Sequence, residues 1–551
     1  MTSSSLVELR SGDVEPSGFV ARSVLAAAPD LTLLSEQIEA SVQTRVRFLE
    51  HGEWQEKSGP ELARDVRARA DSLRREGVEP GRRVGVTGPN TYAWIVADLA
   101  LLELRAVSVA IPEHLMEDCE TLAEEYDLSL VLAPRSWTTK HQPPSWVRYL
   151  DEDDTRPGSV RVPRERYPDP FFTEPTLAFS SGTTGKLKCL RVSRRGIEQV
   201  LTSFAKAFPI GPDDSVLVFL PLSNLQQRLM VYGALWLGIS LVLATPQQLF
   251  RALKEGKPSI IIGPPALYET IHGRYLALPL AFRVVARCLA LALRTLPSRV
   301  VAAVNRRIYR KLYESLGGRV HFMITGMAHI RRSTLTFFKQ AGLVLFEAYG
   351  LTECGIVCSN LPAANRIGSV GRPFDPDSVR IANDGEIIVT KTHPLASGYL
   401  GEADAHLVFP DAHTVCTGDS GHFDADGFLY IDGRKKALLI TSGGYKFHPE
   451  GLESMLNDCP VVERAAVLLL DGGALLCAVL TLRADSAGGA AVAQAFVSAL
   501  NRRLPEAGRI GRVVIRAQPF RLEDGTLTRN LKLDRAAIAT ALAAEDAATR
   551  S

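Results

Sequence analysis

The sequence predicts an α/β protein: a large N-terminal domain of mostly parallel sheets sandwiched by helices, a β-barrel-like part, and a small α+β C-terminal domain. Three observations favour this fold class. Short apolar runs alternate with helix-like segments over much of the chain, as in βαβ units. Hairpin-like strand pairs follow residue 375. The 551 residues suffice for about three to four domains at roughly 150 residues each.

The parallel sheets are predicted from apolar runs that stop at turn residues. Over residues 31–130, a charged periodic stretch (61–76) precedes a strand at 83–87 and an apolar helix at 94–104. Later runs are typical of strands covered on both faces; they lie at 215–220, 259–262, 320–325 and 343–346. Residues 134–175 are rich in proline and charge, so we expect an irregular connection there.

Hairpins and a compact tail are predicted after residue 375. Asn383-Asp384-Gly385 and Asp426-Gly427 mark the turns of hairpins at 379–390 and 421–431. The tail has strand-like runs at 465–470 and 475–482, and an amphipathic helix at 491–504. We therefore expect an extension over 1–30, a main domain over 31–433 and a small domain over 434–551.

Composition excludes several protein classes. The formal net charge is +2, with 46% hydrophobic and 23% charged residues, which argues against fibrous, disordered and broadly nucleic-acid-binding proteins. The 8 cysteines are scattered, as is typical of reduced cytosolic thiols. Cys354 and Cys358 alone lack the partners of a zinc site. The polar N-terminus and the absence of a long uncharged apolar run predict a cytoplasmic chain with no signal peptide and no membrane-spanning helix.

The most informative run follows a short apolar strand. It reads Phe179-Ser180-Ser181-Gly182-Thr183-Thr184-Gly185-Lys186-Leu187-Lys188. Closely spaced small residues let backbone amides wrap an anion, while hydroxyls and lysines add donors and charge, so the run predicts a phosphate loop. The glycine spacing and Leu187 differ from a Walker A motif. A flexible surface turn is the alternative for this run in isolation.

Further motifs follow in a fixed order, and together they carry a family resemblance. They are Ala348-Tyr349-Gly350-Leu351-Thr352-Glu353-Cys354-Gly355, Thr417-Gly418-Asp419, Asp432-Gly433-Arg434-Lys435-Lys436 and Leu527-Thr528-Arg529-Asn530-Leu531-Lys532. With the phosphate loop, this order resembles the adenylate-forming superfamily of acyl-CoA synthetases, non-ribosomal peptide adenylation domains and luciferases. The run Pro221-Leu222-Ser223-Asn224-Leu225-Gln226-Gln227-Arg228 is most similar to long-chain, bubblegum-type fatty acyl-CoA synthetases.

The resemblance implies a two-step reaction with ATP, Mg²⁺ and coenzyme A. A carboxylic acid attacks the α-phosphate of ATP to give acyl-AMP and pyrophosphate, and the acyl group then passes to the thiol of coenzyme A. Because the acid and the phosphate are both anions, cations and oriented donors must neutralise the developing charge. By resemblance, Lys532 supplies the bridging ammonium group, Glu353 and Thr184 hold the metal, and Asp419 and Arg434 bind the ribose. A surface lysine is the alternative for Lys532.

The resemblance also implies the remaining site residues. Tyr349 would stack on adenine, above a close backbone approach at Gly326. Lys436 would be the hinge about which a mobile small domain turns to present residues 443–446 for thioester formation. Asn224 and Arg228 are candidates for the acyl site. The full ATP- or AMP-binding set is Ser180, Ser181, Gly182, Thr183, Thr184, Gly185, Lys188, Gly326, Met327, Ala328, Glu347, Ala348, Tyr349, Gly350, Leu351, Thr352, Asp419, Arg434 and Lys532, and the thiol-step set is Gly443, Gly444, Tyr445 and Lys446.

Several positions depart from the family pattern and leave alternatives open. Leu187 and Cys189 replace the usual Pro and Gly, Asn224 replaces a His, and Gln227 replaces a Glu. We therefore keep three hypotheses: an acyl-CoA synthetase for a fatty or bulky hydrophobic acid, an adenylating enzyme that transfers to a carrier-protein thiol or an amine, and a half-active nucleotide-binding relative. The basic stretch 282–311 indicates either a peripheral contact with anionic lipid or a solvated helix face. The oligomeric state stays open.

Overall fold

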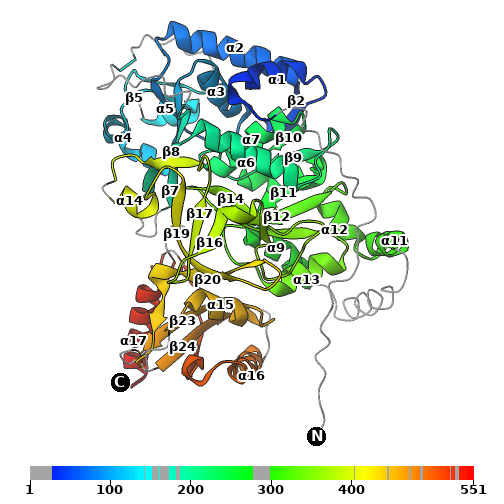
Figure 1. Ribbon diagram of the computed structural model, residues 1–551, viewed down its shortest axis with the longest axis vertical. Coiled ribbons are helices and arrows are strands. Elements are labelled where there is room, and N and C mark those ends of the chain that lie inside the picture. Colours follow the sequence, from blue (N-terminus) through cyan, green and yellow to red (C-terminus); the bar gives the residue numbers. More distant parts are fainter. Residues whose placement is uncertain are drawn as a thin grey trace.

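The computed structural model describes residues 28–550 apart from 142, 152–159, 162–172, 182–186, 277–297, 403, 443–445, 471–472, 474, 484–487, 522 and 528–532. Its elements form two large mostly parallel sheets, a smaller antiparallel sheet and a C-terminal three-stranded sheet, and helices cover the two large sheets and the C-terminal sheet (Figure 1). This architecture confirms the predicted α/β class. No helix in the described part of the chain is long and apolar enough to cross a membrane.

The first large sheet carries the strands on either side of the predicted phosphate loop. Its order is β18-β8-β7-β4-β3-β5-β6. The strands are β3 (Arg83–Val86), β4 (Val107–Ala110), β5 (Leu128–Ala133), β6 (Val147–Tyr149), β7 (Thr176–Ser181), β8 (Leu187–Val192) and β18 (Ala396–Tyr399). The central strands pair in parallel, whereas β8 is antiparallel to both β7 and β18. A strand from late in the chain therefore lies beside the phosphate-loop hairpin.

The second large sheet carries the Tyr349–Glu353 motif. Its order is β15-β14-β13-β12-β11-β9-β10-β1-β2. The strands are β1 (Arg45–Glu50), β2 (Glu53–Ser58), β9 (Ser215–Val218), β10 (Ser240–Leu243), β11 (Ile260–Gly263), β12 (Phe322–Thr325), β13 (Leu345–Leu351), β14 (Gly355–Ser359) and β15 (Arg372–Pro373). Strands β9 to β13 are parallel, so their carboxyl ends meet at one edge.

The main hydrophobic core lies between the two large sheets. Alternate residues of each strand face opposite sides: Val216 and Val218 join the core between the sheets, whereas Leu217 packs in a cluster on the other face. The same core contains buried residues of several helices, among them α3 (Tyr92–Glu103), α6 (Arg194–Ala207) and α7 (Leu225–Trp236). Helices therefore fill the space between the sheets, as predicted for sheets sandwiched by helices.

Other helices cover the outer faces of this core. Two helices pack near the N-terminus, α1 (Leu34–Ala40) and α2 (Gly59–Arg75), and α2 begins with a capping box between Ser58 and Glu61. The remaining helices of this part are α4 (Cys119–Glu125), α5 (Arg135–His141), α8 (Leu249–Arg251), α9 (Pro265–Leu276), α11 (Ser298–Ile308), α12 (Arg310–Ser315), α13 (Arg332–Gln340) and α14 (Ala405–Val408).

A four-stranded antiparallel sheet forms the predicted barrel-like part. Its order is β16-β17-β19-β20, with β16 (Val379–Ile381), β17 (Glu386–Thr390), β19 (Thr414–Phe423) and β20 (Leu429–Arg434). The expected hairpins at 379–390 and 421–431 are both present. By contrast, the connection expected to be irregular contains α5 and β6, which shows that proline and charge were a misleading signal for 134–150.

We name residues 434–551 the C-terminal unit. After a short pair, β21 (Leu439–Ile440) and β22 (Lys446–Phe447), it forms a sheet of β23 (Val462–Leu470), β24 (Leu475–Leu482) and β25 (Arg512–Arg516). Helices α15 (Pro449–Asn457) and α16 (Gly489–Asn501) share one buried cluster with this sheet, and α17 (Arg535–Arg550) shares a second. Both clusters contain residues of this unit alone.

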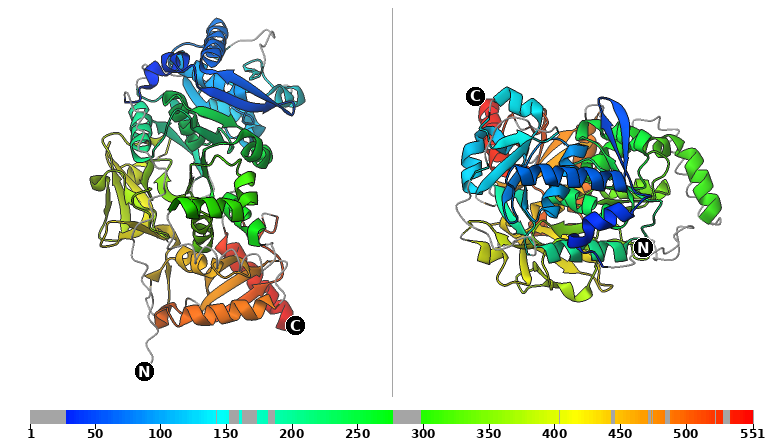
Figure 2. Two further views of the ribbon diagram at one scale, coloured as in Figure 1. Left: turned by 90° about the vertical axis from the view of Figure 1, so that its right-hand side faces the viewer. Right: turned by 90° about the horizontal axis from the view of Figure 1, so that it is seen from above.

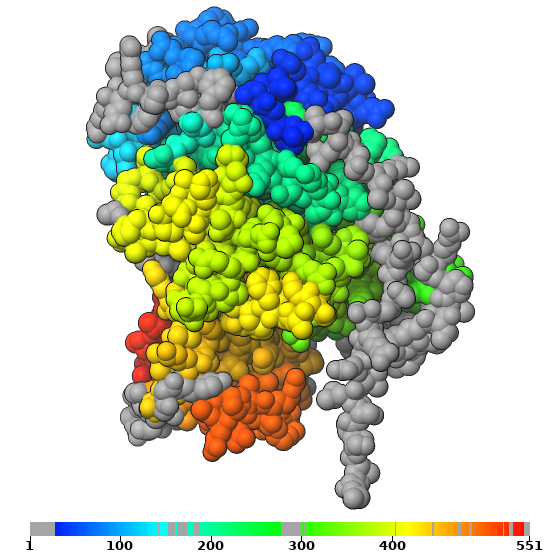
Figure 3. Space-filling view, in the orientation of Figure 1, coloured from blue at the N-terminus to red at the C-terminus, as the bar shows by residue number. Residues whose placement is uncertain are grey.

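The C-terminal unit lies against the end of the large part that carries α13 and β20 (Figures 2 and 3). Arg331, which precedes α13, donates to the backbone oxygens of Val462, at 3.1 Å, and Glu463. Its guanidinium also lies 3.7 Å from Glu269. These contacts tie the first residues of β23 to the large part.

Candidate active site

The expected strand before the predicted phosphate loop is present as β7, and a second strand that was not expected, β8, pairs with it in a hairpin. Near the end of β7, Ser180 lies opposite Lys188 on β8, in antiparallel register. The turn itself, with Gly182, Thr183, Thr184 and Gly185, lies outside the described residues. The ammonium group of Lys188 is 4.7 Å from the ring centroid of Tyr399 and 3.9 Å from Glu402.

Sheet register explains why Tyr399 meets Lys188. Tyr399 on β18 is paired with Leu190 on β8, and Lys188 lies two residues from Leu190, so it faces the same side. Diagonal neighbours of this kind are about 7–8 Å apart between antiparallel strands, within reach of an aromatic ring and a long side chain. A cation over an aromatic face is attracted by the ring quadrupole.

Tyr399 also contacts the predicted metal ligand. Its phenol donates a hydrogen bond to Glu353 Oε1 at 2.7 Å, and the backbone oxygen of Glu353 accepts from the amide of Ala396 at 2.9 Å. Next to this turn, the Lys391 ammonium donates to the backbone oxygen of Cys354 at 2.9 Å. One short segment, 391–399, therefore holds the turn that carries Glu353.

Glu353 fits a magnesium role only together with ligands from the substrate. Within the described part of the chain, no three His, Cys, Asp or Glu residues gather as a metal site. A magnesium ion bound through one or two carboxylates takes its other oxygens from phosphate and water. The carboxylate, with a lysine and a phosphate-loop hairpin nearby, suits such a site.

A second group of contacts gathers around Asp419, which pairs with Arg434 across the β19–β20 hairpin. Arg434 Nε lies 2.9 Å from Asp419 Oδ1, and the Tyr349 phenol donates to Asp419 Oδ2 at 2.7 Å. Burial raises the pKa of Asp419, which is 6% exposed, while Arg434 acts to lower it. Because a carboxylate accepts about four hydrogen bonds, Asp419 keeps capacity for ribose hydroxyls.

At the predicted adenine-binding backbone, the residue that follows β12 comes close to the middle of β13. Gly326 follows β12, and a Cβ atom there would lie 3.1 Å from the backbone oxygen of Ala348 on β13. Met327, next along, has φ +70° and is 51% exposed. Glu347 accepts from the amide of Gly368 at 2.9 Å, and burial raises its pKa to about 8.

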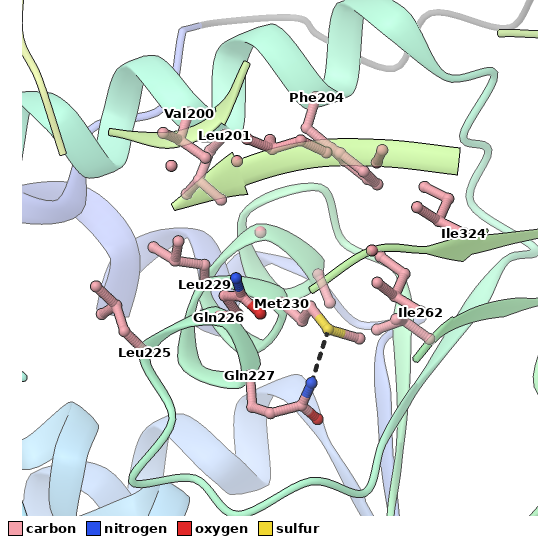
Figure 4. A pocket seen from close by; sticks show the side chains of 18 of the residues that line it. Val200, Leu201, Phe204, Leu225, Gln226, Gln227, Leu229, Met230, Ile262 and Ile324 are labelled. Carbon is pink, nitrogen blue, oxygen red and sulfur yellow. Dashed lines mark hydrogen bonds between the residues drawn. The ribbon is translucent and has the colours of Figure 1, made fainter. Parts of the chain in front are cut away.

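An apolar cavity of about 160 Å³ lies between α6, α7 and the strands β9, β11 and β12 (Figure 4). Its walls are mostly aliphatic and aromatic. They reach Gly326, Met327 and the stretch from Ala348 to Thr352, so the cavity adjoins the motif residues. Helices α6 and α7 contribute lining residues that include Val200, Phe204, Gln226, Gln227, Met230 and Gly233.

Neither predicted acyl-site residue is among the residues that line this cavity. Asn224 caps the start of α7, where its Oδ1 accepts from the amide of Gln226 at 3.1 Å. Arg228 is fully buried and binds Asp98 on α3, with Nη2 2.6 Å from Oδ1 and Nε 3.1 Å from Oδ2. Arg228 therefore ties α7 to α3 and does not line this cavity.

Several cavity-lining residues were not predicted from the sequence, although they recur at helical spacing along α6 and α7. Gln226, Met230 and Gly233 are spaced by four and three residues on α7, and Val200 and Phe204 by four on α6, which is the spacing of one helix face. That face is indistinguishable in sequence from one that packs in a core. Tyr399 was also missed, because its partners lie far away in the chain.

The structure describes only some of the residues assigned to the hinge, to the thiol step and to the bridging ammonium group. Lys436 lies in a short turn of helix (Lys435–Ala437) directly after β20, and Lys446 begins β22. Gly443, Gly444, Tyr445 and Lys532 lie outside the described residues. The flanks of Lys532, Leu527 and Leu533, are joined by an isolated antiparallel bridge on the C-terminal unit.

Residues 35–400 match the protein family described as AMP-binding enzyme. The chain therefore belongs to that family, and the predicted resemblance to adenylate-forming enzymes is confirmed. The predicted enzyme class, an AMP-forming acid–thiol ligase that uses ATP, Mg²⁺ and coenzyme A, is confirmed at the level of the family.

The chain is similar to curated long-chain ligases. It is 27% identical over 460 residues, 76% of each chain, to long-chain-fatty-acid–CoA ligase FadD15 of Mycobacterium tuberculosis. It is 24% identical over 490 residues, 79% of this chain and 66% of the relative, to long-chain-fatty-acid–CoA ligase ACSBG2 of Xenopus laevis.

Solved structures share the fold. The anthranilate CoA ligase AuaEII in complex with anthranoyl-AMP has a TM-score of 0.71 at 16% identity, over 93% of this chain and 98% of that one. The o-succinylbenzoate CoA synthetase MenE of Bacillus subtilis, in complex with ATP and magnesium ion, has a TM-score of 0.67 at 20% identity, over 91% and 98%.

Proposed function

We propose that this chain activates a hydrophobic carboxylic acid with Mg·ATP to form acyl-AMP and pyrophosphate, and then forms the thioester with coenzyme A. The observation that carries the proposal is the apolar cavity that opens onto the residues from Ala348 to Thr352. An apolar tail in this cavity would place its carboxyl group next to the motif. Burial of each methylene contributes about 0.8 kcal/mol, which favours long or bulky acids.

The charged groups around the cavity mouth suit the nucleotide. In this proposal Glu353 binds the metal, with Thr184 assisting from the phosphate loop. Lys188 approaches the phosphates, and Asp419 accepts from the ribose beside Arg434. The distances among Tyr349, Asp419 and Arg434 support a preorganised ribose site, because these donors and acceptors already hold one another in place.

In the first half-reaction, Lys532 supplies the ammonium group that neutralises the repulsion between the carboxylate of the acid and the α-phosphate of ATP. We propose that the large domain ends at residue 433, and that the C-terminal unit then turns about Lys436 to present residues 443–446 for the thiol step. A hinge needs only to absorb a change in φ and ψ, so Lys436 itself has no required contact with substrate.

The acyl acceptor is proposed to be coenzyme A, on the strength of the named long-chain–CoA ligases among the relatives. A carrier-protein thiol and an amine are the other acceptors that the same acyl-AMP could meet. Mass spectrometry of products formed with coenzyme A, with a phosphopantetheinyl carrier protein and with amino acids separates them. Failure of coenzyme A to turn over, with another acceptor consumed, would replace this part of the proposal.

We also propose a peripheral contact with anionic lipid through α11 and α12. Four exposed basic residues lie there, Arg306, Arg307, Arg310 and Lys311, beside the 45% exposed Val300. Helix α11 lies at the outer edge of the molecule (Figure 1). Co-sedimentation with vesicles of phosphatidylcholine, with and without anionic lipid, tests this contact. If equal amounts of protein sediment with neutral and with anionic vesicles, the basic surface of α11 and α12 is a solvated helix face and not a lipid contact.

The decisive experiment is acid-dependent release of pyrophosphate across a panel of carboxylic acids. Wild type should turn over apolar acids, and Lys532→Ala should abolish that release. Lys140→Ala, at an exposed position on α5, is the matched control and should behave as wild type. Nucleotide binding by calorimetry without any acid-dependent release would instead identify a half-active relative.

A further inference from the structure

The side-chain amide of Gln227 has an orientation fixed by its neighbours. Its Oε1 accepts from the backbone amides of Phe219 at 3.1 Å and Leu220 at 3.2 Å. Both partners are N–H donors, so they require the oxygen, and a flipped amide would place NH₂ against N–H. The nitrogen must therefore point the other way.

That nitrogen lacks a good acceptor. Within the described chain, its hydrogen-bond partner is the thioether of Met230, with Nε2 3.4 Å from Sδ (Figure 4). A thioether sulfur is a weak acceptor, and an amide NH₂ carries two donor hydrogens. Gln227 is only 2% exposed, so bulk water does not satisfy these donors.

Gln227 and Met230 both line the apolar cavity. A buried donor without a full partner loses the hydrogen bond that it would make to water, so an unmatched NH₂ on such a wall is unfavourable until an acceptor arrives. The neighbouring Gln226, which is partly buried, also lines the cavity. Two amides therefore interrupt an otherwise mainly apolar surface on the α7 side.

The position of Gln227 along the cavity follows from the sheet. Phe219 and Leu220 come directly after β9, at the edge where β11 ends at Gly263 and β12 is followed by Gly326. Strands β9 and β12 are separated by β11 alone, which is about 10 Å across two strand spacings. The amide thus lies nearer to the reacting end of the cavity than to the end lined by Val216 and Ile239.

We propose that the acid accepted by this chain carries a hydrogen-bond-accepting oxygen, such as a hydroxyl, ether or keto oxygen, on the carboxyl-proximal part of its apolar chain. Gln227 Nε2 donates to that oxygen and exchanges a weak thioether contact for a full hydrogen bond. The inference rests on the proposed function, since it takes the cavity as the acyl site. It names the class of acid within that function.

The residue type at this position matters for the same reason. Family resemblance places a glutamate where this chain has Gln227. An ionised glutamate accepts from the two backbone amides equally well, but it has no hydrogen to donate into the cavity. Gln227 keeps the structural contact and adds a donor, which makes Gln227→Glu the informative substitution.

The test compares isosteric acids. The straight-chain acid that turns over best is matched with analogues in which one methylene at a time is replaced by an ether oxygen. Pyrophosphate release gives kcat/KM for each. Wild type should show one carboxyl-proximal position at which the ether analogue exceeds its flanking analogues by about 3- to 10-fold, the range of one net hydrogen bond.

Two variants test the assignment to Gln227. Gln227→Glu should flatten that preference while the plain acid still turns over. Met230→Leu removes the competing thioether at similar volume, and should increase the preference about 2-fold or more, because the thioether hydrogen bond is then lost. Met230→Leu also keeps the test open should Gln227→Glu fail to fold, which a thermal melt would reveal.

The outcomes separate this inference from the function beneath it. A flat profile in wild type, or an unchanged peak in Gln227→Glu, would overturn the inference and leave the acid-activating function intact. Equal losses for the plain and ether acids in Gln227→Glu would overturn it as well, because the donor would then serve the carboxylate. Absence of release with every acid would remove the proposed function itself.

Discussion

Tyr399→Phe is the most informative single substitution at the candidate active site. It removes the phenol that donates to Glu353 Oε1 at 2.7 Å and keeps the ring that lies 4.7 Å from the Lys188 ammonium. The proposed metal ligand then loses the group that orients it, while the strand pairing of β18 with β8 is retained. The expected result is weaker use of Mg²⁺ by a folded protein.

The expected loss of activity in Tyr399→Phe follows from the charge of Glu353 and from the partial exposure of both side chains. A hydrogen bond to a charged group contributes about 1.5–3 kcal/mol when it is buried. Both side chains here are only partly buried, so water replaces part of the lost contact and about 1–2 kcal/mol remains. That loss corresponds to about 5- to 30-fold in kcat/KM for Mg·ATP.

The chain contains a matched control for this substitution. Tyr92 donates to Asp65 at 2.8 Å, and Lys57 lies 3.4 Å from the same carboxylate and 5.8 Å from the Tyr92 ring. Tyr92→Phe therefore breaks the same type of triad away from the motifs. It should lower the unfolding free energy about as much as Tyr399→Phe, by about 1 kcal/mol, and leave the Mg²⁺ dependence unchanged.

The assay is acid-dependent pyrophosphate release titrated with Mg²⁺ at fixed ATP. Tyr399→Phe should raise the half-saturating Mg²⁺ concentration, and Tyr92→Phe should not. The reasoning is refuted when Tyr399→Phe is folded and titrates like wild type although Glu353→Gln has lost activity. In that case Tyr399 would contribute packing alone.

Three further predictions concern other parts of the molecule. Asp98→Asn leaves the fully buried Arg228 without its charge partner, and should lower the unfolding free energy by about 3–5 kcal/mol in urea titrations. Burial raises the pKa of Glu347 to about 8 from 4.5. Between these two pH values the folded state binds more protons than the unfolded state, so the unfolding free energy falls as the pH rises. Glu347→Gln should remove this pH dependence in thermal melts. Arg331→Met removes the donors to β23 and should speed limited proteolysis between the large part and the C-terminal unit, whereas unchanged cleavage would show that this contact does not hold the unit.

Much of the fold could be predicted because local signals agreed with it. The runs at 215–220, 259–262 and 320–325 became β9, β11 and β12, since continuous apolar residues bounded by turns suit strands buried on both faces. The run at 343–346 was predicted too short: β13 continues to Leu351. Its added residues pair with β14 at a bulge where Gly350 meets the backbone of Gly355, so tertiary pairing and not apolar content sets its end.

The site could be predicted only where the motif is local. Asp419 and Arg434 were assigned by family pattern, and the β19–β20 hairpin brings them into contact. Arg228 does not line the cavity, and its sequence context could not reveal this. An arginine on a cavity-lining helix looks the same in sequence whether it faces the cavity or the opposite side of α7. Only the packing of α7 against α3, which supplies Asp98, decides between the two.

Strand β18 links the two large sheets that the proposed triphosphate site would use. The strands that flank the predicted phosphate loop belong to the first large sheet, and Glu353 lies in the turn between β13 and β14 of the second, so neither sheet alone positions both ends of the proposed site. Strand β18 pairs with β8 in the first sheet, while Tyr399 and the Ala396 amide bind Glu353 from the second. A displacement of β18 must therefore disturb both ends of the proposed site together, and substitutions that loosen this strand should weaken Mg²⁺ and ATP use in parallel. A variant that changed one without the other would show that the two ends are positioned independently.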